Sequence, residues 1–232
     1  MWQFIRQDMI DIALFSVNAF QENTYVVADK DGDRCIIVDP GCSNRTETAA
    51  VADYIRRKGL KPEMIVGTHG HIDHILGVDA LKQEFGIPYA LSSDDGFLLA
   101  SASQQAAMFG LASIASPTLD IDLKDRDEIV FGGCRMKIIP TPGHTPGHVC
   151  LYYEEGKMLF TGDTLFKESI GRTDLPGGDY SWIMRSILDR IVPLGDDVKF
   201  FPGHGPESNI GHETLYNPFV TEVLNHEVDY RS

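Results

Sequence analysis

The sequence predicts an α/β protein, and two observations carry this prediction. Apolar, β-branched runs punctuated by turn residues open each half of the chain, as expected for strands. Segments with apolar residues at helical spacing then alternate with further strand-like runs. Strands, then strand–helix alternation, then the same order again predict two packed sheets with helices outside. Because no repeat or Pro/Gly/Ser linker interrupts the sequence, we expect a single domain over residues 1–232.

In the first half, three strands joined by tight turns lead to a sharp break at Asp39-Pro40-Gly41. Strands are expected at residues 12–17, 24–29, 34–39, 63–68 and 87–91. Helices are expected at residues 44–59, with Gly59 at the C-terminus, and 74–86. The inner face of the first helix is predicted to carry Ala49, Ala50, Ala52, Tyr54 and Ile55.

The second half begins after a less regular segment, residues 92–123. Strands return at residues 127–132, 134–140, 148–155, 157–163 and 198–204. Helices are expected at residues 180–191 and 211–230. Several of these strand-like runs stop at a glycine, and the loops that follow strand ends commonly carry functional side chains.

Composition excludes some function classes. The formal net charge of -14, without any cluster of basic residues, argues against a nucleic-acid partner. No apolar run approaches the roughly 18–20 residues that cross a bilayer, and the N-terminus lacks the pattern of a signal peptide, so we expect a cytoplasmic protein without a membrane partner. The four cysteines are scattered without a CxxC pair, which favours buried, reduced thiols.

The heptapeptide THGHIDH, residues 68–74, is the strongest chemical signal. His69 and His71 lie two residues apart and can point to the same side, while Asp73 and His74 follow as the chain enters a helix. Gly70 is expected to let the backbone pass close to a bound ion. Imidazole and carboxylate ligands suit zinc, iron or manganese. Four ligand-type side chains in one loop favour part of a two-metal site over a polar turn.

Further ligand-type residues stand where later strands end. His144 follows residues 134–140, Asp163 ends residues 157–163, and His204 ends residues 198–204. In each case an apolar run stops near a glycine and presents one histidine or aspartate. This repeated placement is the independent support for a metal site assembled from both halves of the chain.

HxHxDH followed by a lone His, a lone Asp and a third lone His resembles the metallo-β-lactamase superfamily, which implies an αββα sandwich. The segments GRTDLPGGDY, residues 171–180, and QQAAMFG, residues 104–110, are similar to the glyoxalase II-like thioester hydrolases, in the short form without the added helical domain. The resemblance implies that one metal is held by His69, His71 and His144. It implies that the other is held by Asp73, His74 and His204, with Asp163 bridging the two.

The same resemblance implies roles beyond metal binding. Asp39 is similar to the carboxylate that steadies metal-bound histidines in this family, although a turn-forming aspartate before proline explains it equally well. Zinc β-lactamases usually carry Cys at the position of Asp163, so antibiotic hydrolysis is not expected here. His148 is expected to pack beside the ligands and not to bind metal.

The expected cofactors are two divalent metal ions, with zinc favoured and iron or manganese as alternatives. Two ions about 3.5–4 Å apart can share a hydroxide, because each lowers the pKa of bound water toward about 7. The expected reaction is attack of this bridging hydroxide on a thioester of the S-(2-hydroxyacyl)glutathione type, such as S-lactoylglutathione. Asp73 is the candidate catalytic residue, as a ligand that also orients the hydroxide.

Substrate contacts are less clearly marked. Lys167 and Arg172 are candidates for binding an anionic substrate, although Arg172 is equally open to an ion pair with Asp174 or Asp179. Met108 and Phe109 are candidates for contacts with the acyl group, with a plain packing helix as the alternative. The expected partner is therefore a small-molecule thioester, and the sequence does not indicate an oligomeric state.

Other activities remain open at this point. Persulfide dioxygenases share the fold and a GRTD loop but use one iron held by two histidines and an aspartate. A lactonase is a closer rival among the hydrolases. A non-enzymatic metal-binding protein is disfavoured because all seven ligand positions are retained.

Overall fold

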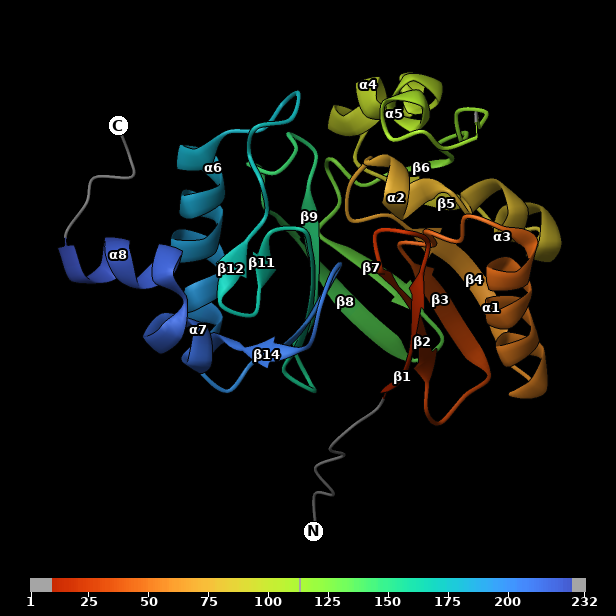
Figure 1. Ribbon diagram of the computed structural model, residues 1–232. Coiled ribbons are helices and arrows are strands. Elements are labelled where there is room, and N and C mark those ends of the chain that lie inside the picture. Colours follow the sequence, from red (N-terminus) through yellow and green to blue (C-terminus); the bar gives the residue numbers. More distant parts are fainter. Residues whose placement is uncertain (1–9, 113, 227–232) are drawn as a thin grey trace, which may run out of the picture.

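The computed structural model describes residues 10–112 and 114–226, and two six-stranded sheets organise it (Figure 1). The first sheet has the order β1-β2-β3-β4-β5-β6. Its strands are β1 (Ile10–Val17), β2 (Glu22–Asp29), β3 (Arg34–Val38), β4 (Lys61–Val66), β5 (Tyr89–Leu91) and β6 (Ile121–Asp122). The second sheet has the order β14-β13-β10-β9-β8-β7. Its strands are β7 (Glu128–Phe131), β8 (Cys134–Pro140), β9 (Val149–Tyr153), β10 (Met158–Gly162), β13 (Lys199–Pro202) and β14 (Ser208–Asn209). A separate hairpin pairs β11 (Leu165–Phe166) with β12 (Ser169–Ile170).

Helices cover the outer face of each sheet, as Figure 1 shows. Those beside the first sheet are α1 (Arg45–Arg57) and α3 (Val78–Phe85). Those beside the second are α6 (Tyr180–Arg185), which continues through a π turn (Ser186–Ile191) and a 3-10 turn (Val192–Leu194), α7 (Ile210–Tyr216) and α8 (Pro218–His226). At the top of Figure 1 lie α4 (Gly96–Ala100), which follows the 3-10 helix Ser93–Asp95, and α5 (Ala102–Met108), with α2 (Ile72–Ile75) below them. The order of layers is therefore αββα, which confirms the expected fold.

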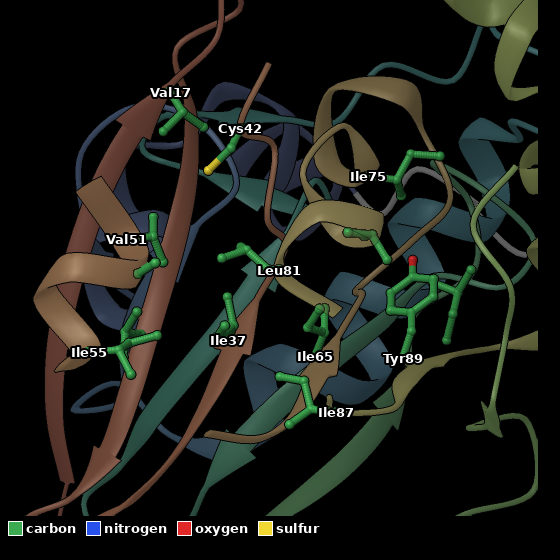
Figure 2. Packing of buried hydrophobic residues seen from close by; sticks show 14 of the residues in the cluster. Val17, Ile37, Cys42, Val51, Ile55, Ile65, Ile75, Leu81, Ile87 and Tyr89 are labelled. Atoms are coloured by element: carbon green, nitrogen blue, oxygen red, sulfur yellow. The ribbon is translucent and has the colours of Figure 1, made fainter. Parts of the chain in front are cut away.

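Three buried clusters hold these layers together. Between the sheets, Tyr25 packs with Phe131 and Phe160. Under the first pair of helices, Val51 and Ile55 of α1 belong to one cluster with residues of β3 and β4 (Figure 2). A third cluster lies between α6 and the second sheet. The inner strands β2, β3, β9 and β10 are thus buried on both faces, which explains why they read as continuous apolar runs.

Strand direction explains why the ligand-type residues meet. In the first sheet β3, β4, β5 and β6 are parallel, so their carboxyl ends lie at one edge. In the second sheet β10 is parallel to β13, and β8 and β10 are both antiparallel to β9. Consequently β8, β10 and β13 also end at one edge. Loops after parallel strand ends are where α/β proteins commonly build their sites.

Several local expectations were wrong. The helix expected at residues 74–86 is broken, because the backbone at Gly77 lies against Cys42 and donates to the carbonyl of Pro40. Ala49 and Ala50 are exposed, and Val51 takes the inner position on α1. The tail helix is two helices that meet at Asn217, and residues 227–230 lie outside the described part.

The segment at 92–123 contains two short helices and a short strand that its apolar pattern did not indicate. All four cysteines are buried, as expected: Cys35, Cys42, Cys134 and Cys150. In the part of the chain that the structure describes, no helix is long and apolar enough to cross a membrane.

Candidate metal centre

The THGHIDH loop connects β4 to α2 at the carboxyl edge of the first sheet. His71 is the N-cap residue of α2, so Asp73 and His74 project from the first turn of this helix. His69 and His74 are fully buried, and His71 is nearly so. Asn18 donates from its side-chain amide to the backbone oxygen of Asp73, 2.9 Å away, which ties the start of α2 to the β1–β2 turn. This contact anchors the loop to the β1–β2 turn without any bound ion.

The first group of converging donors consists of His69, His71 and His144, all buried, with ligand atoms within 4.8 Å of one another. The Nδ1 atom of His71 lies 2.8 Å from Nε2 of His144. His69 and His71 come from the first sheet and His144 from the loop after β8. This is the trio expected to hold one ion.

The second group consists of Asp73, His74 and His204. Nε2 of His204 lies 3.2 Å from Oδ2 of Asp73 and 3.3 Å from Nε2 of His74, and the third distance, from His74 to Asp73, is 3.8 Å. Ligands at about 2.0–2.1 Å in a tetrahedral zinc site are themselves roughly 3.3 Å apart. The spacing of this group therefore fits one such ion.

Asp163 lies between the two groups. Its Oδ1 is 3.4 Å from Nε2 of His74, and its Oδ2 is 3.5 Å from Nε2 of His144 and 3.6 Å from Nε2 of His204. A Cβ at position 203 would come within 2.2 Å of Oδ1, so only glycine fits beside this carboxylate. The position is the one expected for a carboxylate bridging two ions.

Buried polar atoms without a partner test whether cations fit here. Oδ1 of Asp163, Nε2 of His69 and Nε2 of His71 are buried and have no hydrogen-bond partner. Leaving such atoms unsatisfied is costly, and buried carboxylates are normally paired or bound to a metal. The donor set is imidazole and carboxylate, which suits zinc, iron or manganese. The residues present therefore fit two divalent cations.

Three of the seven candidate ligands are also anchored through the ring nitrogen that faces away from the site. Nδ1 of His144 donates to the carbonyl of Arg172 at 2.7 Å, and Nδ1 of His204 donates to the carbonyl of Phe20 at 3.1 Å. Nδ1 of His74 donates to Oδ2 of Asp39 at 3.1 Å. Such contacts fix ring orientation and tautomer, leaving Nε2 to face the site.

Asp39 occupies the supporting position that the family resemblance implied. Besides holding His74, its two oxygens accept from the backbone N–H and the hydroxyl of Thr68, each at 2.6 Å. Because that hydroxyl donates to Asp39, it can accept from Nδ1 of His69, 3.1 Å away. Asp39 has a positive φ of 48°, a backbone conformation that aspartate tolerates better than most residues. One carboxylate thus braces a histidine from each donor group.

The pKa values and charges of the side chains in the site favour the binding of cations. Burial lowers the pKa of His71 to about 3, so this ring is neutral near pH 7, as a ligand must be. Burial also lowers the pKa of His69 well below its ordinary value. For His74 burial acts in the same direction, but the carboxylates of Asp163 and Asp73 outweigh it and hold its pKa well above the ordinary value. These carboxylates attract positive charge to the point between the two groups.

Three further buried residues, His148, Glu22 and Asp95, support the candidate ligands, and the sequence had indicated such a place only for His148. His148 accepts from the backbone N–H of Asp163 at 3.0 Å and stacks on His69, with ring centroids 5.0 Å apart. Glu22 is fully buried, accepts from Thr24, and has an oxygen 3.9 Å from Nδ1 of His74. Burial raises its pKa well above the usual range. The expectation that His148 packs beside the ligands agrees with its place.

Asp95 is the third, and it joins the two ligand loops. Oδ2 accepts from the backbone N–H of Gly70 at 2.9 Å and from the hydroxyl of Thr145 at 2.7 Å, while Oδ1 accepts from the N–H of Gly147 at 2.7 Å. A Cβ at position 70 would come within 2.9 Å of Leu98. Gly70 is thus needed for the approach of α4, while its expected role beside a bound ion stays a prediction.

We expect Asp95→Asn to destabilise the protein by about 2–3 kcal/mol and to weaken metal binding about 10–100-fold. The amide nitrogen must face an N–H or hydroxyl donor, and both ligand loops lose part of their shared anchor. Chemical unfolding and metal titration measure the two effects. Asp94→Asn is the matched control, because Asp94 is the exposed neighbour and pairs with Lys124 on the surface. Equal behaviour of the two variants would contradict this role for Asp95.

Three of the four residues predicted to contact the substrate line a cavity beside the candidate ligands, and the fourth does not. This cavity of about 650 Å³ is lined by Met108, Phe109 and Arg172, together with five of the metal-ligand candidates. Arg172 makes a two-point ion pair with Asp174, at 2.6 and 2.7 Å. This ion pair is one of the two alternatives that the sequence left open for Arg172. Lys167 is exposed and is not among the residues that line this cavity. Direct substrate contact by any of the four stays a prediction.

The αββα layers and two converging His/Asp donor groups define a protein built to hold metal ions at the edge between two sheets. The chain matches the metallo-beta-lactamase superfamily over residues 17–204, and it belongs to that superfamily. Members bind divalent metals, typically two, and membership supports a metal-dependent hydrolase. The family expected from the sequence is confirmed.

Relatives of known name cover nearly the whole chain. One is hydroxyacylglutathione hydrolase GloC of Haemophilus influenzae, 38% identical over 91% of this chain and 98% of that protein. The crystal structure of BLEG-1 B3 metallo-beta-lactamase is 34% identical, with a TM-score of 0.82 over 91% of this chain and all of that one. The crystal structure of TTHA1623 in a di-iron-bound form is also 34% identical, with a TM-score of 0.79 over 89% of this chain and 99% of that one.

Proposed function

We propose that this protein hydrolyses thioesters of the S-(2-hydroxyacyl)glutathione type with two bound divalent metal ions. The observation that carries the proposal is the complete donor set, two groups of three side chains with Asp163 between them. The relative named as a hydroxyacylglutathione hydrolase supports the thioester substrate, and the relative in a di-iron-bound form supports two ions. Zinc remains our first expectation for their identity.

When bound, the two ions would lower the pKa of a water molecule and polarise the carbonyl of the substrate. The cavity is lined by His71, Asp73, His144, Asp163 and His204, so the reacting carbonyl has to lie beside these side chains. In the overall reaction water adds its oxygen to the acyl carbon, the C–S bond breaks, and the thiolate leaves with the electron pair. The products are a carboxylate and a thiol.

The residues around the cavity suit a leaving group that needs no proton. Apart from the metal-ligand candidates, Arg172 is the only titratable side chain among the described residues that line it. An arginine does not give up its proton, so the cavity offers no dedicated general acid. A thiol has a pKa of about 8.5 and leaves as a thiolate, whereas an alkoxide or an amine depends much more on proton donation. This chemistry favours a thioester over a lactone or an amide.

Asp73 is placed to orient the attacking water. Its carboxylate lines the cavity and contacts His204, and the pKa of Asp73 is held below its ordinary value because His74 and His204 outweigh the effect of burial. It is therefore ionised at neutral pH and able to accept a hydrogen bond from water. Asp73 belongs to the second donor group and lines the cavity, so its position fits the two roles that we assign to it, metal ligand and acceptor for the attacking water.

We expect Asp73→Asn to lower kcat about 100-fold or more even when metal is restored, because the amide is a weaker acceptor and a poorer ligand. The measurement is kcat alongside metal content in the same preparation. Asp79→Asn on α3 is a control, because Asp79 does not line this cavity. Full turnover by Asp73→Asn with two ions bound would remove Asp73 from the mechanism.

One experiment tests the proposed function against its rivals. The purified protein is assayed for metal content and for turnover of a thioester, a lactone, a persulfide and a β-lactam. Two metal ions with thioester turnover support the proposal. One iron with persulfide oxidation indicates a dioxygenase. The β-lactam belongs in the panel because a relative carries the name of a β-lactamase, although Asp163 was expected to disfavour that reaction. Two bound ions without thioester turnover would reject the proposal.

A small-molecule partner and a cytoplasmic location complete the proposal. Both rest on the sequence, together with the size of the cavity, which suits a small molecule. The single domain over residues 1–232 also stays a prediction.

A further inference from the structure

The cavity above the donor groups has one feature that thioester hydrolysis alone does not explain. On one side Phe97 of α4, Met108 at the end of α5 and Phe109 after it line the space, and Phe20 of the β1–β2 turn completes this side. We call these four residues the apolar wall. Phe20 and Phe109 touch edge to face, with ring centroids 5.2 Å apart. The contact joins α5 to the turn whose carbonyl at Phe20 anchors His204.

The apolar wall is unusually open to solvent. Met108 is 71% exposed, Phe97 43% and Phe109 42%. Single exposed apolar residues are common, but a group of large ones lining a concave site beside catalytic donors points to a ligand. Phe166, Leu175 and Pro176 also line the cavity and present further apolar surface. The cavity is therefore suited to hydrocarbon.

Two of the polar side chains that line the cavity, Gln105 and Arg172, are already engaged. Gln105 uses its amide oxygen to accept from the N–H of Ile72 and its amide nitrogen to donate to the carbonyl of Leu98. Arg172 is held by both oxygens of Asp174. Among the described lining residues Arg172 is also the only side chain with a permanent positive charge.

Glutathione carries two carboxylates, which a binding site normally meets with cations or helix N-termini. The wall offers neither a free arginine nor a lysine, and the formal net charge of the chain is -14. An anionic thiol therefore gains little from the surface next to the reacting carbonyl. An apolar group gains contact along four large side chains.

We infer that the apolar wall binds a hydrocarbon or aromatic substituent of the thioester, next to the carbonyl that is hydrolysed. This inference rests on the proposed function and narrows its substrate class from small hydroxyacyl conjugates to thioesters with an apolar arm. The arm can belong to the acyl group or to the thiol. The wall is then a specificity-determining surface, separate from the residues that carry out hydrolysis.

Two substrate series distinguish the sources of the arm. In the first, the thiol is N-acetylcysteamine and the acyl group grows from acetyl to octanoyl. In the second, the acyl group is acetyl and the thiol grows from ethanethiol to octanethiol. We expect kcat/KM to rise about threefold to fourfold per added CH2 in one series, up to the length of the wall. A glutathione thioester with the same acyl group should gain no more than about threefold over N-acetylcysteamine.

Substitutions in the apolar wall test whether it causes the dependence of kcat/KM on chain length. The double substitution Met108→Gln with Phe109→Gln should lower kcat/KM for the longest substrate about tenfold or more relative to the acetyl substrate, mainly through KM, and so flatten the dependence on chain length. Leu215→Gln is the matched control, because Leu215 is 69% exposed on α7 and lies outside the cavity. It should leave the chain-length dependence unchanged.

Binding provides a readout that does not depend on turnover. Calorimetry with non-hydrolysable S-alkyl thioethers of N-acetylcysteamine should show affinity that rises with chain length in the parent protein and not in the double variant. A flat response in both substrate series and in calorimetry overturns the inference, even if thioesters are hydrolysed. Chain-length-dependent binding without any thioester turnover supports the wall and rejects the proposed reaction. The two proposals therefore fail separately.

Discussion

Asp163→Asn is expected to lower kcat/KM about 1000-fold and to reduce bound metal from two ions to one or fewer. The carboxylate directs one oxygen toward His74 and the other toward His144 and His204, so it is the side chain shared by both donor groups. The amide keeps the shape but loses the negative charge, and its nitrogen cannot bind a cation. A 1000-fold fall in kcat/KM corresponds to a loss of about 4 kcal/mol of electrostatic stabilisation of the transition state.

Metal analysis and steady-state kinetics on one preparation measure both effects. Asp53→Asn is the control, because Asp53 is an exposed aspartate on α1 that pairs with Arg56 at the surface. Its activity and metal content should match those of the parent protein. An Asp163→Asn enzyme that keeps two ions and a kcat/KM within about threefold of the parent would show that no bridging carboxylate is needed.

Removing the ions should cost stability as well as activity. Ligands for each expected ion come from both sheets, so bound ions link the two layers, and buried atoms such as Nε2 of His69 gain a partner. An ion present at about 1000 times its dissociation constant stabilises the folded state by about 4 kcal/mol. For a chain of this size that corresponds to a fall in Tm of roughly 8–16 °C on chelation.

Scanning calorimetry before and after dialysis against a chelator measures this change. Adding back zinc, iron(II) or manganese separately should restore Tm and activity, and the ion that restores both identifies the functional metal. A variant with His69→Gln and His204→Gln, one ligand lost from each group, should show little response to the chelator. If the parent protein keeps its Tm and activity after its metal content has fallen to zero, the centre is not what we propose.

The positions of the candidate ligands were predictable because short sequence patterns mark them. HxHxDH places four donors within six positions, and each later ligand follows an apolar run that ends near a glycine. The strand order then brings these ends to one edge, which the strand-like pattern alone did not specify. Seven candidates from three separate strand ends and one loop lie together as expected.

The supporting residues were not predictable for an equally physical reason. Asp94 and Asp95 are adjacent and identical in the sequence, yet one pairs with Lys124 at the surface and the other is buried under two loops. Only the tertiary fold separates them. The break at Gly77 also depends on a distant segment, because Pro40 and Cys42 occupy the space beside it. Helical spacing on either side continues as if no break were present.

The donors contributed by each half of the chain have a consequence for biosynthesis. A ribosome delivers His69, His71, Asp73 and His74 early, while the partner donors His144, Asp163 and His204 emerge much later. Domains tend to fold as units once their chain is available. An ion captured by the nascent first half would lack a ligand from the second half in either site. If the two donor groups hold ions as we propose, both sites are complete only after translation has passed His204 and both sheets have docked.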